Sequence, residues 1–380
     1  MKRQAEADQA AQAFHLALSQ IGVETTAEAF KLWSEVPAAQ RAATASGWLR
    51  RAITLVMGRR RMARDLARAY YRLARALQTG TTVADPYHPE PSTVTLGDLR
   101  RQFATLAGTY EAPAPAPPTG GSDRLDKAAD QPISEQASRI EDDAREALQN
   151  GDEHQLDDHA EDWERILVEE LEGLRDEEER IEREAEEELR TVLDALGTRN
   201  LDKRLAQVDD QQAAKDADRQ REEAHRQAAA QQAGAASRVA MNGGRSAIWN
   251  HTSRDRRALG YVRLSRTGTP CGFCAMLISR GVAYKSERSA TYKDGDLFHD
   301  NCHCYAEPVF RRDQFDGSGL FELNRQYQAL WPEVTKGYSG KAALNAWRRF
   351  LRAQQRAHHQ AEAQAARPPD DHSPGGVTRV

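Results

Sequence analysis

The sequence predicts a mainly α-helical chain that also contains one small α+β domain. Long stretches place apolar residues at three- and four-residue steps, the spacing of amphipathic helices. All four cysteines lie in the 34 residues from Cys271 to Cys304, between short runs typical of strands, so a zinc ion is expected to staple this domain. Only 39% of the 380 residues are hydrophobic. The mean hydropathy of -0.77 is low for a single compact globule, so we expect an extended chain of several parts.

The composition changes several times along the chain, and these changes predict its domains. An N-terminal helical domain with a basic face is expected first, followed by a disordered linker rich in proline and glycine. An acidic and polar helical segment, the zinc-binding domain, a C-terminal helical segment and a disordered tail come after it. The expected boundaries are 1–111, 112–131, 132–234, 235–312, 313–365 and 366–380.

The N-terminal domain is predicted to present arginine on one helix face. Apolar residues keep a helical period from residue 38 to Leu77, and Gly80 is placed to end that helix. The arginine-rich face favours an anionic partner, either nucleic acid or protein. The alternative is a solvated surface, or one that docks on the acidic segment. The arginines proposed to bind nucleic acid are Arg50, Arg51, Arg59, Arg60, Arg61, Arg64 and Arg68.

The acidic segment is predicted to form a long helix. Between residues 132 and 194 acids outnumber bases by about 25 to 7, yet leucine and isoleucine keep a heptad-like seam that Glu178 interrupts. A helix with one apolar side must pack on a partner or on the arginine-rich domain. Residues 202–232 have almost no apolar face, which predicts a spacer or an exposed helix.

The zinc-binding domain is predicted to combine helices with short strands. A helix should break at Asn242-Gly-Gly and then resume. Strands are expected at Gly260–Arg266, Val282–Lys285 and Tyr305–Phe310, and a helical turn at Ala275–Arg280.

The cysteines form a pattern of candidate metal ligands. In Cys271-Gly-Phe-Cys274 two thiols converge on a tight turn, and a second element supplies His299, Cys302 and Cys304. A tetrahedral structural zinc needs four ligands. We expect these to be Cys271, Cys274, His299 and either Cys302 or Cys304, and the choice between the last two stays open. His303 is expected not to bind.

Disulfides, a redox dithiol and scattered buried thiols are the alternatives. The opening residues Met1–Glu6 have no apolar core of a signal peptide, which favours a reducing compartment. A redox dithiol would not need the second Cys/His element. Clustering of all four cysteines argues against scattered thiols.

Four segments between residues 236 and 312 occur in a specific combination: Asn242–Arg245, Tyr261–Arg263, Cys271–Cys274 and Phe298–Cys304. In this combination the chain resembles the Mu F-type (MuF-like) phage head-morphogenesis proteins, in which Cys-x-x-Cys precedes His-x-x-Cys-x-Cys. The resemblance implies a minor capsid protein near the portal vertex that acts during procapsid assembly. It implies the portal protein and the capsid or scaffold proteins of the same phage as partners, and the arginine-rich face adds packaged DNA as a nonspecific contact. It places the protein in the virion, and in the host cytoplasm during assembly.

Two other functions remain open. An HNH-type zinc nuclease would use His299, Asp300, Asn301 and His303, although such enzymes usually close the zinc site with a second Cys-x-x-Cys. A zinc-ribbon DNA-binding protein is compatible with the basic excess of residues 251–312. No set of nucleophile, base and orienting group is recognisable, so we expect no enzymatic activity and no small-molecule substrate. No apolar run reaches the length of a membrane span, so no membrane partner is expected.

Overall fold

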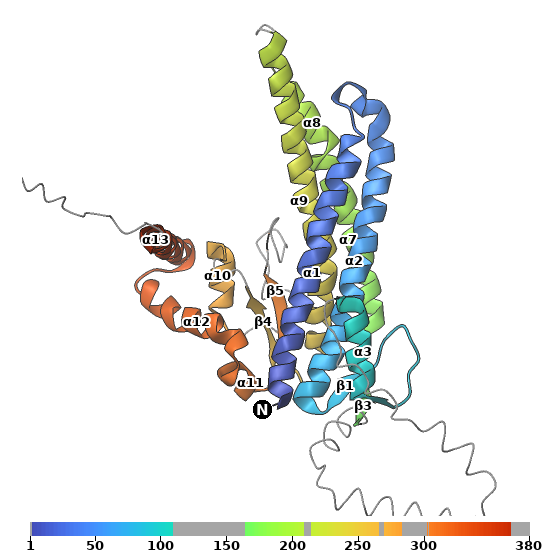
Figure 1. The fold of residues 1–380 in the computed structure, drawn as a ribbon, viewed down its shortest axis with the longest axis vertical. Helices are drawn as coiled ribbons and strands as arrows, with labels where there is room; N and C mark the ends of the chain where they lie inside the picture. The colour runs from blue at the N-terminus through green and yellow to red at the C-terminus, as the bar shows by residue number, and fades with distance from the viewer. Residues whose placement is uncertain are drawn as a thin grey trace, which may run out of the picture.

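A computed structural model describes residues 2–108, 164–208, 214–265, 270–282, 302 and 304–365. Three long helices, α1 (Lys2–Ser34), α2 (Arg41–Thr79) and α9 (Ala214–Arg254), lie side by side and form the main body of the protein (Figure 1). The mainly helical fold class predicted from the sequence is confirmed. The linker expected at 112–131 and the tail expected at 366–380 lie outside the described residues.

The turn between α1 and α2 is fixed by two tryptophans. The ring centroids of Trp33 and Trp48 are 5.0 Å apart with an edge-to-face angle of 78°. Trp33 donates a hydrogen bond from Nε1 to the carbonyl O of His225 on α9, at 3.3 Å. A short 3-10 turn, Ala38–Gln40, connects the two helices. Gly80 ends α2 in the left-handed conformation, with φ 73°, as the sequence predicted.

Helix α9 continues through Asn242-Gly-Gly, so the break predicted there is wrong. A Cβ atom on Gly243 would lie 2.2 Å from the carbonyl O of Arg60, and one on Gly244 would lie 2.9 Å from the carbonyl O of Ala63. The two glycines therefore allow the backbones of α2 and α9 to approach closely, and the packing offsets their low helix propensity. The boundary expected at 234–235 falls inside this helix.

The polar stretch before that boundary is also packed. Small side chains of α9 are buried against the turn between α1 and α2 and against α7 (Leu174–Leu196). The sequence predicted a spacer or an exposed helix here because alanine contributes little to an apolar face. Alanine nevertheless lets helices pack closely, and a buried strip of it is enough. The buried alanines of this strip are Ala224, Ala228, Ala229, Ala233, Ala236 and Ala240.

A small sheet at one end of the bundle was not predicted. Its strands are β1 (Thr81–Val83), β2 (Thr93–Thr95) and β3 (Arg165–Glu169). The central strand β3 is parallel to β1 and antiparallel to β2. Helix α3 (Leu96–Ala107) follows β2 and begins with a capping box, in which the side chains of Thr95 and Asp98 each bond the backbone N–H of the other residue.

Residues 132–163 of the predicted acidic helix lie outside the described residues, and the part that the structure describes begins as a strand rather than a helix. Leu167, placed on the apolar seam, belongs to β3 and is 50% exposed. Helix α7 begins after Gly173, which adopts a left-handed φ of 67°, and the short helix α8 (Thr198–Leu205) follows it. Glu178, the residue that interrupts the seam, is buried on α7 and is 2% exposed.

A second sheet consists of the two antiparallel strands β4 (Gly260–Leu264) and β5 (Tyr305–Val309). These strands confirm two of the predicted ones, whereas the strand expected at Val282–Lys285 falls mostly outside the described residues. Helix α10 (Gly272–Ile278) confirms the predicted helical turn. The chain then forms α11 (Arg312–Gly317), the 3-10 turn Gly319–Phe321, α12 (Glu322–Val334) and α13 (Gly340–Ala365).

A single apolar core joins the sheet of β4 and β5 to the long helices. Phe14 of α1 stacks on Tyr70 of α2 with ring centroids 4.5 Å apart and meets Tyr305 of β5 edge to face. The hydroxyl of Tyr70 donates a 2.5 Å hydrogen bond to Oε1 of the buried Glu307 on β5. The Cys-rich part of the chain therefore rests on the helical body. None of the described helices is long and apolar enough to cross a membrane.

Candidate metal centre

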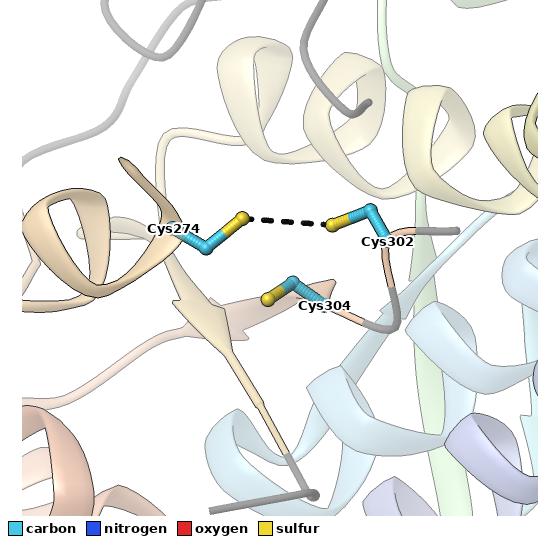
Figure 2. A group of neighbouring side chains, drawn as sticks. All are labelled: Cys274, Cys302 and Cys304. Atoms are coloured by element: carbon cyan, nitrogen blue, oxygen red, sulfur yellow. Dashed lines mark hydrogen bonds between the residues drawn. The ribbon is translucent and has the colours of Figure 1, made fainter. Parts of the chain in front are cut away.

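Three buried thiols converge beside α9. The Sγ atoms of Cys274, Cys302 and Cys304 all lie within 4.8 Å of one another, and those of Cys274 and Cys302 are 3.6 Å apart. Figure 2 shows the three side chains grouped together, with the sulfur atoms of Cys274 and Cys302 facing each other. Their exposed fractions are only 1–3%. Both halves of the predicted cysteine pattern therefore meet in space.

Short structural elements position these thiols. Cys274 lies in the first turn of α10, after β4 has brought the chain to this side of the core. Cys304 immediately precedes β5, whose first residue Tyr305 pairs with Leu264 at the end of β4. Asn324 of α12 donates hydrogen bonds to the carbonyl O of Arg263 at 3.0 Å and of Ile278 at 3.2 Å. These bonds hold β4, α10 and α12 together around the site.

Cys271 occupies a different position from the other three cysteines. It is the N-cap of α10, and its Sγ accepts a hydrogen bond from the backbone N–H of Cys274 at 3.4 Å. It is exposed and is not one of the three clustered thiols. Both Cys302 and Cys304 lie in the cluster, although the sequence analysis expected only one of them to bind. His299 and His303 lie outside the described residues.

Two buried arginines accompany the thiols. Nη2 of Arg245 on α9 donates a 2.6 Å hydrogen bond to the carbonyl O of Cys302. Nη1 of Arg263 on β4 donates to Sγ of Cys274 at 3.6 Å. Each arginine is 2% exposed. Burial lowers the pKa of Arg245 to about 10, although the neighbouring cysteines raise it.

The arginines make the site favourable for thiolate. Hydrogen bonds from the Cys274 and Cys304 thiols lower the pKa of Cys302 well below its usual value, and the positive charges of Arg245 and Arg263 lower it further. Thiolate is the form of cysteine that binds metals. The centre therefore favours thiolate at Cys302. The pKa values of Cys274 and Cys304 are raised, chiefly by hydrogen bonds with neighbouring cysteine thiols, so a metal that binds there would release their protons.

The geometry fits zinc. Two sulfur ligands about 2.3 Å from a tetrahedral zinc ion lie about 3.8 Å apart, close to the 3.6 Å between Cys274 and Cys302. Three thiolates give a zinc centre a net negative charge, and the two guanidinium groups offset it in a site that excludes water. Arg245 and Arg263 were not among the site residues predicted from the sequence. Both arginines lie in segments that carry the resemblance to MuF-like proteins. Their place in these segments is the sequence signal that could have indicated a role in the site.

The structure distributes the seven arginines proposed for nucleic-acid binding over different environments. Arg60 and Arg68 are buried and form ion pairs with Glu182 at 2.9 Å and Glu178 at 3.3 Å, both on α7. Within the described chain, the acidic helix thus covers part of the basic face, as the docking alternative predicted.

The other five arginines lie nearer the surface. Arg59 is paired with Glu24 and Glu28 of α1, at 2.7 and 2.6 Å. Arg64 is half-buried and lies over the ring of Tyr87. The exposed members are Arg50, Arg51 and Arg61, of which Arg51 pairs with Glu35 at 2.8 Å. The seven do not form one continuous open surface.

Comparison with known proteins gives one match. Residues 182–330 match the model of a family described as VG15 protein, which is a viral family. The match indicates a phage protein. No curated protein and no solved structure matches the chain. The matched region extends from α7 to α12 and contains the three clustered cysteines and both buried arginines.

Proposed function

We propose that this phage protein is a minor capsid protein of the MuF-like type, which acts in head morphogenesis near the portal vertex. The observation that carries the proposal is the convergence of Cys274 with Cys302 and Cys304. These residues come from the two separate motifs on which the resemblance rests. The viral family match over residues 182–330 supports a phage protein, which is the broader class to which the proposal belongs. Portal, capsid and scaffold proteins of the same phage are the proposed partners.

The role proposed for the cysteine centre is structural. One zinc ion would be held by Cys274, Cys302 and Cys304, with Cys271 or His299 as the fourth ligand. Cys271 is a reasonable fourth ligand because it belongs to the same turn as Cys274 and bonds that residue's N–H. The ion would tie the start of α10, which packs on α12 and α13, to the start of β5, which packs on α9.

Native mass spectrometry of the purified protein tests the metal. We expect one zinc per chain. If His299 is the fourth ligand, the variant Cys271→Ser should keep the ion. If Cys271 is the fourth ligand, the variant His299→Ala should keep it. Cys302→Ser should lose the ion and lower the melting temperature. Absence of metal from protein purified without chelators would exclude the structural zinc.

The location in the phage is tested separately. Mass spectrometry of purified virions of the encoding phage should detect a few copies per particle, and cross-linking of procapsids should join them to the portal protein. Deletion of the gene should reduce the yield of DNA-filled heads. A protein absent from both procapsids and virions would contradict the proposal.

We propose that the protein has no enzymatic activity of its own. The alternative nuclease would rely on His299, Asp300, Asn301 and His303, all outside the described residues. Incubation of duplex DNA with the protein and Mg²⁺ or Mn²⁺ is the test. Cleavage that His303→Ala abolishes would establish the nuclease instead.

A further inference from the structure

The C-terminal helix α13 carries a basic surface that the sequence analysis did not single out. Residues 334–361 contain six lysines and arginines and no acid. Four of the arginines, Arg348, Arg349, Arg352 and Arg356, are exposed on α13. Three of them follow one another at four-residue steps, so they recur about every 6 Å along one side of the helix. We call these four residues the α13 arginine surface.

This surface differs from most arginines of α2 in its ionic partners. On α2, Arg59, Arg60 and Arg68 are paired with glutamates of α1 or α7. Within the part of the chain that the structure describes, the four arginines of α13 form no ion pair with an acid. Their charge is therefore available to an external anion.

The helix that carries the surface is firmly anchored. Trp347 is fully buried and meets Tyr327 and Trp331 of α12 edge to face, with ring centroids 5.4 and 5.3 Å away. The stem of Arg348 lies against Gly272, where a Cβ would be 2.5 Å from Cγ of the arginine. Figure 1 places α13 beside α10 and α12, on the side away from the long helices. The arginines are thus presented on a rigid element at the edge of the molecule.

We propose that the α13 arginine surface binds double-stranded DNA through its phosphates, without reading sequence. A row of guanidinium groups on one helix side complements a polyanion with closely spaced charges. The inference rests on the proposed function only for the choice of double-stranded DNA as the polyanion. The DNA-binding surface proposed here is on α13, whereas the sequence predicted one on α2.

An acidic protein surface is the competing occupant, and among the described elements α7 of a second copy is the most acidic candidate. Several acids of α7 already pair with arginines of their own helix. Arg180 pairs with Glu177 at 2.6 Å and with Glu184 at 2.5 Å, and Arg175 pairs with Glu179 at 2.9 Å. DNA phosphates have no such internal partner, so the observations favour DNA.

Fluorescence anisotropy of the full-length protein with a labelled 30-base-pair duplex of random sequence tests the proposal. The informative variant is the triple substitution Arg349→Gln, Arg352→Gln and Arg356→Gln, which spares Arg348 because its stem supports the cysteine turn. The matched control is Arg50→Gln, Arg51→Gln and Arg61→Gln on α2, which removes the same charge from exposed positions. Circular dichroism and metal content should be unchanged in both variants.

We expect the α13 variant to lose at least about tenfold in affinity at low salt. The slope of log affinity against log salt concentration should become shallower by about 2.7, because each phosphate contact contributes about 0.9. The α2 control should lose much less. Equal losses in both variants, no loss in the α13 variant, or no DNA binding by the intact protein would each overturn the proposal.

Sedimentation of the same proteins distinguishes the competing occupant. If the α13 variant converts a dimer to a monomer and leaves DNA affinity unchanged, the surface is a protein contact and the DNA proposal is wrong. DNA binding by a protein that is absent from procapsids and virions would refute the proposed function alone. A capsid protein that does not bind DNA would refute this inference alone.

Discussion

The guanidinium of Arg68 on α2 donates a 3.3 Å hydrogen bond to the carboxylate of Glu178 on α7, and both side chains are buried. Asp65 supports the same guanidinium from one turn away, at 2.9 Å. The single acid that interrupts the apolar seam of α7 is therefore a buried ionic contact between two helices. Removing one partner of such a pair leaves the other charge without compensation.

Glu178→Gln should destabilise the protein by about 3 kcal/mol, because the buried Arg68 then keeps only one acid. Chemical denaturation followed by circular dichroism measures the loss. Glu179→Gln is the matched control, since this neighbour is exposed and pairs only with Arg175 on its own helix; its denaturation curve should overlay that of the parent. If the denaturation curves of both variants overlay that of the parent, the buried pair contributes nothing to stability.

The contact between α2 and α9 predicts opposite effects of two glycine-to-alanine substitutions. Gly243→Ala should destabilise by about 2 kcal/mol, because the new methyl would collide with the carbonyl O of Arg60. Gly58→Ala on α2 meets nothing within 4 Å and should stabilise by up to about 1 kcal/mol through helix propensity. Thermal unfolding of the two variants provides the comparison. A gain in stability for Gly243→Ala would contradict the close approach.

Arg263 should strengthen metal binding without touching the ion. Arg263→Met removes a positive charge that faces the thiolates, and substitutions of this kind typically weaken a metal site by about 10- to 100-fold. Competition with a chromophoric zinc chelator measures the change. Arg280→Met, on an exposed residue just after α10, serves as the control. Equal zinc affinity of the two variants would remove Arg263 from the centre.

Glu307 predicts a pH dependence of stability. Burial raises its pKa to about 8, whereas in the unfolded chain the carboxyl titrates near about 4.3. Between these values the folded state keeps a proton that the unfolded state has lost. Stability should therefore fall as the pH rises from about 4 to about 8, by at most about 1.4 kcal/mol per pH unit.

The variant Glu307→Gln isolates this contribution, because the amide oxygen can still accept the hydrogen bond from Tyr70. The difference in unfolding free energy between parent and variant should follow the predicted decline and become constant above about pH 8. A difference that does not change with pH would mean that Glu307 is ionised in the folded protein.

The sequence predicted the parts of the fold whose signals are local. Gly80 ends α2, and the segments Gly260–Arg266 and Tyr305–Phe310 contain β4 and β5, each as expected. The small sheet was missed because β1 and β2 have only three residues each and are paired through β3, about 80 residues away along the chain.

Other differences arise because long-range packing overrides local preference. Gly243 disfavours a helix in isolation and is needed where two helices touch. In the cysteine centre, spacing predicted that the two motifs meet. It did not predict that both Cys302 and Cys304 join Cys274 while Cys271 caps α10, because that arrangement depends on how β5 enters the core. Arg245 carries no local sign that it contacts Cys302. Its role depends on a contact between α9 and the segment before β5, and the two residues that meet there are 57 positions apart in the sequence.

The hydrogen bond from Arg245 to the carbonyl O of Cys302 has a consequence for the order of events during synthesis. Helix α9 leaves the ribosome before the segment with Cys302 and Cys304, so the guanidinium is in place before the last ligands arrive. Once β5 has paired with β4, the three clustered thiols are buried. An ion would then reach these thiols most readily while the chain is still closing, and its release would require this part of the protein to open. Metal uptake would be a step of folding, and the exchange rate of the ion would report how often this part of the protein opens.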